Sequence, residues 1–212
     1  MEFFSQWFNP QCHRICLIGM GNPDWGDDGC GCQLAHLLQE RCLGHPPETS
    51  RVDTGLWTII DAGTTPENWL AALAGEGFDR WLWMDAVDMK CQPGSTAFLA
   101  APQIASQFPQ LSTHKIALST LTQLVESRGK TTVGLLAIQP ANLTWGTNLS
   151  PTVSTTVEAL ADLMAAAWAL STGSGGQIPP PPRRIRTDDP SNKMLHPEAA
   201  LAAKPTAGGR PC

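Results

Sequence analysis

The sequence predicts an α/β fold with a mostly parallel central sheet and helices on both faces. Short apolar segments alternate with longer segments that carry apolar residues at helical spacing, and this alternation is typical of parallel strands joined by crossover helices. The segment 132–139, TVGLLAIQ, is an almost continuous apolar run, as expected for a strand covered on both faces. The 212 residues are enough for one domain with a substantial core.

The first predicted strand and helix surround a glycine-rich turn. Residues 14–20 are short and apolar and predict a strand, and residues from about 27 to 42 predict a helix. Asp27 and Asp28 suit the start of that helix, because the helix dipole is positive there. The apolar stripe of the helix consists of Leu34, Leu37 and Leu38.

The middle of the chain predicts three further strands and one helix. Residues 56–61 form the second strand, and a helix follows over 65–75. Pro66 suits the first position of this helix because proline has no N–H to leave unpaired. Residues 80–86 and 95–100 form the third and fourth strands.

Two helices and a strand complete the predicted domain. Ser112 or Thr113 can cap a helix that Gly129 ends, and the strand 132–139 follows. The last helix spans 151–170 and opens with proline. The apolar stripes of the two helices are Leu118, Leu121, Leu124 and Val125, and Val153, Val157, Leu160, Met164 and Trp168.

The two ends differ in composition from the domain at 14–170. Residues 1–13 form an extension whose aromatic residues could dock on the domain. Residues 171–212 are rich in glycine, proline and small residues, and such a segment buries too little apolar surface to offset the entropy of ordering. We therefore expect a disordered tail. The aromatic residues of the extension are Phe3, Phe4, Trp7 and Phe8.

Composition narrows the function classes. The net charge of −5 and the absence of a broad basic cluster argue against nucleic-acid binding. The chain contains no run of 18 apolar residues, so we predict no membrane span. The N-terminal residues lack the features of a signal peptide. These features predict a cytoplasmic protein.

The cysteines fit a reducing compartment. Seven cysteines are an odd number and form neither a CxxC pair nor a zinc-binding spacing. Cys30 and Cys32 lie in the first turns of the predicted helix, where a thiolate can be favoured. The alternative is that both are small buried packing residues, and the usual burial of free cysteine favours that alternative.

The turn at 19–31, GMGNPDWGDDGCG, joins a strand to a helix, as nucleotide-binding loops do. The dinucleotide motif requires a third glycine where this chain has Asp24. A phosphate would also meet Asp27 and Asp28, and no lysine follows the glycines as it does in a P-loop. The acidic turn instead suits a metal cation or an acid–base group.

Three polar residues are predicted to share one edge of the sheet. Asp28 follows the first strand, Asp85 ends the third, and His114 follows the fourth. Ligands of open α/β sheets bind outside the carboxyl ends of the strands, and two carboxylates with an imidazole can bind a divalent ion. Each residue also has a structural interpretation. Asp28 could cap the helix, Asp85 could accept hydrogen bonds from loop amides, and His114 could be a surface residue. Asp88 is a weaker candidate that more simply caps its loop.

These segments together resemble the [NiFe]-hydrogenase maturation proteases, and most closely the formate-hydrogenlyase branch of that family. The resemblance covers about residues 14–170 and depends on the order of several short motifs. The motifs are GxGN at 19–22, DDGxG at 27–31, DAGTTPEN at 61–68, MDAxD at 84–88, STH at 112–114 and GxxxIQP at 134–140.

The resemblance implies a three-layer α/β/α fold and a cytoplasmic, monomeric endopeptidase. Such an enzyme would remove the C-terminal extension of a hydrogenase large-subunit precursor after nickel insertion. The family's metal ligands fall on Asp28, Asp85 and His114, which would bind nickel already held by the precursor. No organic cofactor is implied. Gly29 and Gly31 would let the substrate backbone approach, and Asn22 would position the turn or bind the substrate.

Two other functions remain open from the sequence. A metal-dependent hydrolase of small substrates could use the same three residues. A non-catalytic factor that binds nickel or the precursor would need only the binding part of the site. Metal binding by the isolated protein, or precursor binding without cleavage, would distinguish these functions from the protease.

Overall fold

The computed structural model describes residues 7–8, 14–73, 75–107, 117–127 and 130–172. These residues all belong to one unit, which ends at Pro179. The elements are β1 (Ile15–Gly19), the 3-10 helix η1 (Gly26–Gly29), α2 (Cys30–Leu43), β2 (Arg51–Asp53), β3 (Trp57–Asp61), α3 (Glu67–Leu73), β4 (Arg80–Ala86), β5 (Thr96–Ala100), α4 (Ala101–Gln107), α5 (Leu118–Glu126), β6 (Thr132–Ile138) and α6 (Pro151–Ser171).

The central sheet confirms the predicted fold class. Its six strands follow the order β2-β3-β1-β4-β6-β5. The four inner strands are parallel, whereas β2 and β5 pair antiparallel at the two edges. Every residue of β1 is buried, and so are six of the seven residues of β6, as expected for strands covered on both faces.

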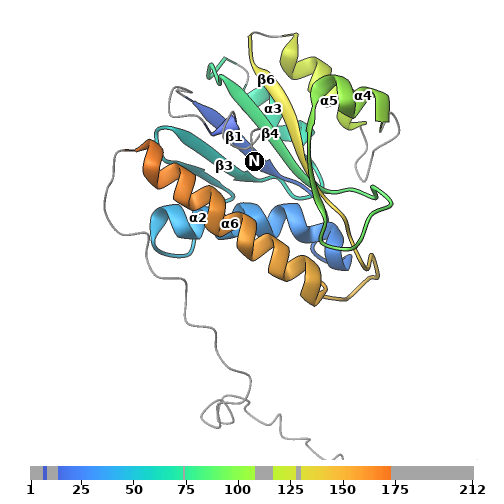
Figure 1. Cartoon of the computed structure of the whole chain (residues 1–212). Coiled ribbons are helices and arrows are strands. Elements are labelled where there is room, and N and C mark those ends of the chain that lie inside the picture. Colours follow the sequence, from blue (N-terminus) through green and yellow to red (C-terminus); the bar gives the residue numbers. More distant parts are fainter. Residues whose placement is uncertain (1–6, 9–13, 74, 108–116, 128–129, 173–212) are drawn as a thin grey trace, which may run out of the picture. The chain divides into compact units, whose positions relative to one another are not determined.

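Helices cover both faces of the sheet and form three layers (Figure 1). Helices α2 and α6 pack on one face, and their buried residues share a core with β1, β3, β4 and β6. Helices α3, α4 and α5 pack on the other face, around the side chains that the strands direct there. The two cores are therefore separate layers, each held by apolar burial against the sheet.

The structure adds two elements and moves the start of a third. β2 has only three residues, two of them charged, and α4 has seven, so neither is long enough to give a periodic pattern. Helix α5 begins at Leu118, after Ala117 in an extended conformation, and not at the predicted caps. Ser112 and Thr113 lie outside the described residues.

The N-terminal segment contributes to the core. Trp7 and Phe8 are both buried and pack in the layer of α2 and α6. The ring of Phe8 lies 5.1 Å from that of Trp57, and the guanidinium of Arg80 lies 5.4 Å from the ring of Trp7. The docking expected for the extension is therefore seen for these two residues. Phe3 and Phe4, and most of the predicted tail at 171–212, lie outside the described residues.

Helix α6 is long and apolar enough to cross a membrane by length and composition alone. In the structure one side of it is buried against the protein instead. That side consists of Val153, Val157, Ala161, Met164 and Ala165. Arg41 of α2 also forms salt bridges of 2.7 and 2.9 Å with Glu158 and Asp162 of α6. These contacts are those of a helix that covers a sheet.

The order of the strands predicts a ligand crevice between β1 and β4. The chain leaves β1 through α2 on one face, and it passes from β3 to β4 through α3 on the other face. Connections that turn to opposite faces leave a gap above the carboxyl ends of the two neighbouring strands. The turn after β1 and the last residues of β4 border this crevice, which is where Asp28 and Asp85 lie.

Candidate active site

The acidic turn holds Asp28 in a defined position beside the crevice. The backbone N–H of Asn22 donates a hydrogen bond of 2.7 Å to Oδ2 of Asp28, and Oδ1 of Asn22 accepts one of 3.0 Å from the N–H of Asp24. Asp28 is only 8% exposed. Gly21, at φ +123°, lies so close that a Cβ there would be 1.8 Å from the carbonyl oxygen of Asp28. Of the two roles considered for Asn22, the structure shows positioning of the turn.

Asp85 lies at the end of β4 and is 2% exposed. Its Oδ1 accepts a hydrogen bond of 2.8 Å from the N–H of Ala86. Burial raises the pKa of the Asp85 carboxyl well above its usual value, and the nearby charge of Asp28 raises it further, against the opposing effect of the Ala86 hydrogen bond. The structure thus brings two of the three predicted site residues together.

The third predicted residue, His114, lies outside the described residues. Among the residues that are described, no group of three His, Cys, Asp or Glu side chains is placed to bind a metal ion. The described part of the site therefore supplies two carboxyl groups. Oxygen donors of this kind suit divalent cations, and a third ligand would have to come from elsewhere.

Gly31 packs the start of α2 onto the ends of β1 and β4. A Cβ at this position would lie 2.0 Å from the carbonyl oxygen of Met84 and 2.5 Å from that of Met20. A Cβ on Gly29 would lie 2.6 Å from the Cα of Pro23. Both glycines are buried, and the structure shows that they permit close internal packing; the approach of a substrate backbone stays a prediction.

Asp27 differs from its neighbour because it anchors a distant loop. Its carboxylate is fully buried and accepts three backbone hydrogen bonds, from Ala141 (2.8 Å), Asn142 (2.9 Å) and Ser150 (2.6 Å). The N–H of Asp27 also donates to the carbonyl of Asn142 at 2.9 Å. These bonds hold the 140–150 loop against the acidic turn, and they leave Asp28 as the carboxylate that faces the crevice.

Gln139 fixes the loop that follows Asp85, a role that sequence reasoning missed. Its Oε1 accepts hydrogen bonds from the N–H groups of Met89 (2.7 Å) and Cys91 (3.2 Å), and its Nε2 donates to Asp88 at 3.3 Å. Asp88 also accepts a bond of 3.1 Å from the N–H of Lys90, which confirms the loop-capping interpretation of Asp88. A glutamine directly after an almost continuously apolar strand was the available signal for Gln139.

The two cysteines of the turn region are packing residues. Cys30 and Cys32 are both buried, and burial, reinforced by neighbouring aspartates, raises the pKa of each thiol. The Sγ of Cys32 lies 3.4 Å from the carbonyl oxygen of Gly21, to which it donates. A raised pKa disfavours the thiolate, so the alternative of a reactive cysteine at the helix start is wrong.

A cleft of about 330 Å³ opens beside Asp28. It connects the turn after β1, the turn after β3 and the loop after β6, because its walls come from all three. The lining residues are Asn22, Trp25, Asp28, Thr64 and Leu143. Oδ1 of Asp61 accepts a bond of 3.2 Å from the N–H of Gly63 and so shapes the turn that carries Thr64. The cleft therefore places apolar side chains beside a carboxylate.

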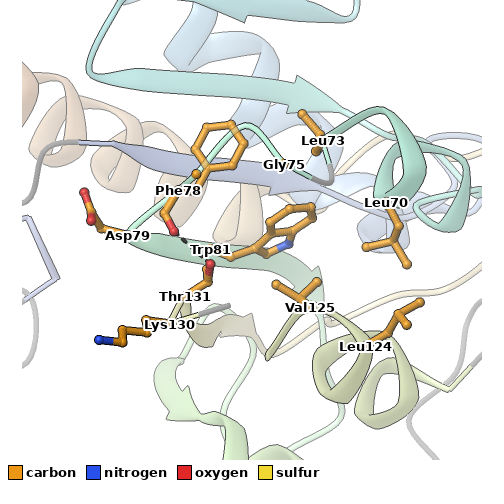
Figure 2. Close-up of a pocket in the computed structure, with 11 residues that line it drawn as sticks. Leu70, Leu73, Gly75, Phe78, Asp79, Trp81, Leu124, Val125, Lys130 and Thr131 are labelled. Carbon is orange, nitrogen blue, oxygen red and sulfur yellow. Dashed lines mark hydrogen bonds between the residues drawn. The ribbon is translucent and has the colours of Figure 1, made fainter. Parts of the chain in front are cut away.

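A second cavity, of about 300 Å³, lies elsewhere and has different chemistry. It is bordered by α3, α5 and the amino ends of β4 and β6, at the other end of β4 from Asp85, and Figure 2 shows its apolar side chains around Trp81. Its polar lining residues are Asp79, Lys130 and Thr131, and Oγ1 of Thr131 donates to the carbonyl of Phe78 at 2.8 Å. Without paired carboxyl groups, this cavity does not suit the chemistry predicted for the acidic turn.

Comparison with known proteins gives one consistent family. The HycI family model, described as hydrogenase maturation protease, matches residues 32–167. The matched region includes Asp85 and His114 and begins after Asp28.

Individual relatives agree with the family match. The chain is 37% identical over 125 residues to the hydrogenase 3 maturation protease of Escherichia coli K12, a match that covers 58% of this chain and 71% of that protein. A crystal structure of the hydrogenase 3 maturation protease is 30% identical, with a TM-score of 0.57 over 70% of this chain and 87% of that one. HycI from Thermococcus kodakarensis, at 22% identity, shares the fold with a TM-score of 0.67 over 78% of this chain and 97% of that one.

Proposed function

This chain belongs to the HycI family of hydrogenase maturation proteases, and we propose that it removes the C-terminal extension of a [NiFe]-hydrogenase large-subunit precursor after nickel insertion. The observation that carries the proposal is the pair Asp28 and Asp85 at the crevice between β1 and β4, next to a cleft that places apolar side chains beside a carboxylate. Family membership favours the protease over the hydrolase of small substrates and the non-catalytic factor.

In this proposal nickel arrives as part of the substrate. Asp28 and Asp85 offer two oxygen ligands, and His114 completes the set as the sequence predicts. A precursor without nickel would lack the ion that these side chains bind, so it would dock poorly.

The two carboxyl groups offer different chemistry because their surroundings differ. Asp28 reaches the cleft and can accept a proton from the water that attacks the peptide bond. Asp85 is buried, and in the free protein its raised pKa favours the protonated form. A positive ion bound here would stabilise the ionised form of Asp85, and it would polarise the scissile carbonyl.

The compartment and the oligomeric state are part of the proposal. The five cysteines among the described residues are all free thiols, which agrees with processing in the reducing cytoplasm. We expect the protease to act as a monomer. Size-exclusion chromatography with light scattering on the purified chain tests that expectation.

Mass spectrometry of the precursor tests the proposed reaction. Incubation of a nickel-loaded large-subunit precursor from the same organism with this protein should give a single shorter chain that has lost its C-terminal segment. Asp28→Asn should reduce the rate at least about a hundredfold, because it removes a negatively charged ligand and proton acceptor. Asp24→Asn removes the same charge from an exposed position in the same turn, and it should change the rate by no more than about threefold.

No shortening of the precursor by the wild-type protein would contradict the proposal. Equal losses of rate in the two variants would also contradict it, since they would show a general effect of charge in place of a specific role of Asp28.

A further inference from the structure

Three large apolar side chains are exposed beside the candidate active site. Trp25 is 45% exposed, Leu143 48% and Trp145 62%, and the two tryptophans are the only exposed ones among the described residues. The rings of Trp25 and Trp145 lie 5.7 Å apart in an edge-to-face arrangement with an interplanar angle of 75°. We call these three residues the aromatic shelf. Exposure of this much apolar surface at one place is typical of a binding surface.

The shelf is held in place by backbone contacts. Trp25 forms an isolated bridge with Thr147, and the N–H of Gly146 donates to the carbonyl of Asp24 at 2.7 Å. The buried Asp27 carboxylate fixes both ends of the loop that carries Leu143 and Trp145. The backbone that carries the rings is therefore positioned before any partner binds, which lowers the entropy lost on binding.

The shelf is continuous with the cleft that contains Asp28. Trp25 and Leu143 line that cleft together with Asn22, Asp28 and Thr64. No cationic side chain is among these described lining residues, and the neighbouring Asp24 is exposed on the same turn. A side chain bound here would meet apolar walls and nearby negative charge, so an apolar group is favoured and an acidic group is repelled.

We propose that the aromatic shelf binds an apolar side chain of the precursor next to the peptide bond that is cut, and that it thereby selects the substrate. This inference rests on the proposed function, because the shelf adjoins the same carboxylate. Its occupant is a polypeptide segment, since the cleft reaches from the shelf to Asp28. A precursor with an acidic residue in this segment would bind poorly.

Steady-state cleavage by shelf variants tests the role of the surface. Leu143→Ala and Trp145→Ser should each raise KM for the nickel-loaded precursor about tenfold or more, while kcat changes by no more than about threefold. The matched control is Leu163→Ala, which truncates a leucine of similar exposure, 52%, on α6. The control should leave both constants unchanged. Thermal unfolding of each variant should match wild type, since the replaced side chains are exposed.

Changes in the precursor test the chemistry of the occupant. Apolar residues on either side of the cut are replaced one at a time by serine and by aspartate. At one position the replacement should raise KM, more for aspartate than for serine, and the loss should largely disappear in the Leu143→Ala protease. Additive losses at every position would overturn the inference.

Binding to an inactive protease separates this inference from the proposed function. Precursor affinity is measured for Asp28→Asn alone and for Asp28→Asn combined with Leu143→Ala. If the wild-type protein cuts the precursor and the shelf variants have the wild-type KM, the inference about the shelf is wrong and the proposed protease activity is supported. If the wild-type protein does not cut the precursor, but the added Leu143→Ala weakens precursor binding at least about tenfold, the proposed reaction is wrong and the inference about the shelf is supported. If the shelf variants instead convert a dimer into a monomer, the surface binds a second copy, and the inference is overturned.

Discussion

Asp85 is buried beside Asp28, and burial, together with the charge of Asp28, raises the pKa of the Asp85 carboxyl. Asp28 comes from the turn after β1 and Asp85 from the end of β4, and the parallel pairing of these two strands brings their ends together. Burial and the nearby negative charge both disfavour the ionised form of Asp85, so this carboxyl group destabilises the free protein at neutral pH. Such a cost at one place is typical of a site that binds a cation.

Asp85→Asn should stabilise the free protein while it abolishes cleavage. The folded-state pKa of Asp85 is raised, so the folded chain binds more protons than the unfolded chain between about pH 4, the unfolded pKa, and the raised folded pKa. Stability from this group is therefore fully present below about pH 4 and is lost as pH rises through the folded pKa. Asparagine does not titrate and avoids that loss.

Denaturant unfolding at two pH values measures the effect of Asp85→Asn. The free energy of unfolding of the variant, relative to wild type, should be higher at pH 8 than at pH 4 by about 1–3 kcal/mol. A difference that does not change with pH would show that Asp85 is not destabilised in the fold.

Asp27→Ala should weaken the fold and disrupt the cleft together. It leaves three backbone N–H groups without their carboxylate, and we expect the free energy of unfolding to fall by about 2–4 kcal/mol. Hydrogen exchange of Ala141, Asn142 and Ser150 should accelerate selectively. The control Asp162→Ala removes an exposed acid that is paired with Arg41 and should cost less than about 1 kcal/mol. Equal destabilisation by the two variants would contradict the anchoring role.

Gly31→Ala should be far more damaging than Gly44→Ala. A Cβ on Gly31 would collide with two backbone carbonyls, whereas a Cβ on Gly44 would meet nothing within 4 Å. Gly44, at φ +77°, bears only the conformational penalty of alanine in the left-handed region, about 1 kcal/mol. We expect Gly31→Ala to lower the free energy of unfolding by more than about 3 kcal/mol. Similar midpoints of thermal unfolding for the two variants would refute the packing role.

The sequence predicted the layers of the fold because their signal is local. The apolar run of β6 and the stripe of α6 directly reflect burial on two faces and on one face. β2 was not predicted because its three residues, RVD, carry no local pattern, and it becomes a strand only by pairing with β3 in the folded chain. Trp7 and Phe8 carried no periodic signal, although they fill part of the core.

The site was predicted less completely than the fold. The positions of Asp28 and Asp85 followed from the rule for strand ends. The sequence did not show that the adjacent residues Asp27 and Asp28 have different roles. What separates them is the loop at 140–150, more than a hundred residues away along the chain. The packing role of Gly31 was also missed, because its close approach to Met20 and Met84 arises only in the folded chain. The sequence suggested only that it would let a substrate backbone approach. The role of His114 stays a prediction.

A comparison of two precursors tests most directly the claim that the carboxyl pair recognises nickel in the substrate. The large-subunit precursor is prepared with and without nickel, and the initial rate of removal of its C-terminal segment is measured by mass spectrometry under the same conditions. We expect rapid cleavage of the nickel-loaded precursor by the wild-type protein, and no detectable cleavage of the nickel-free one. Equal rates for the two precursors would contradict that claim.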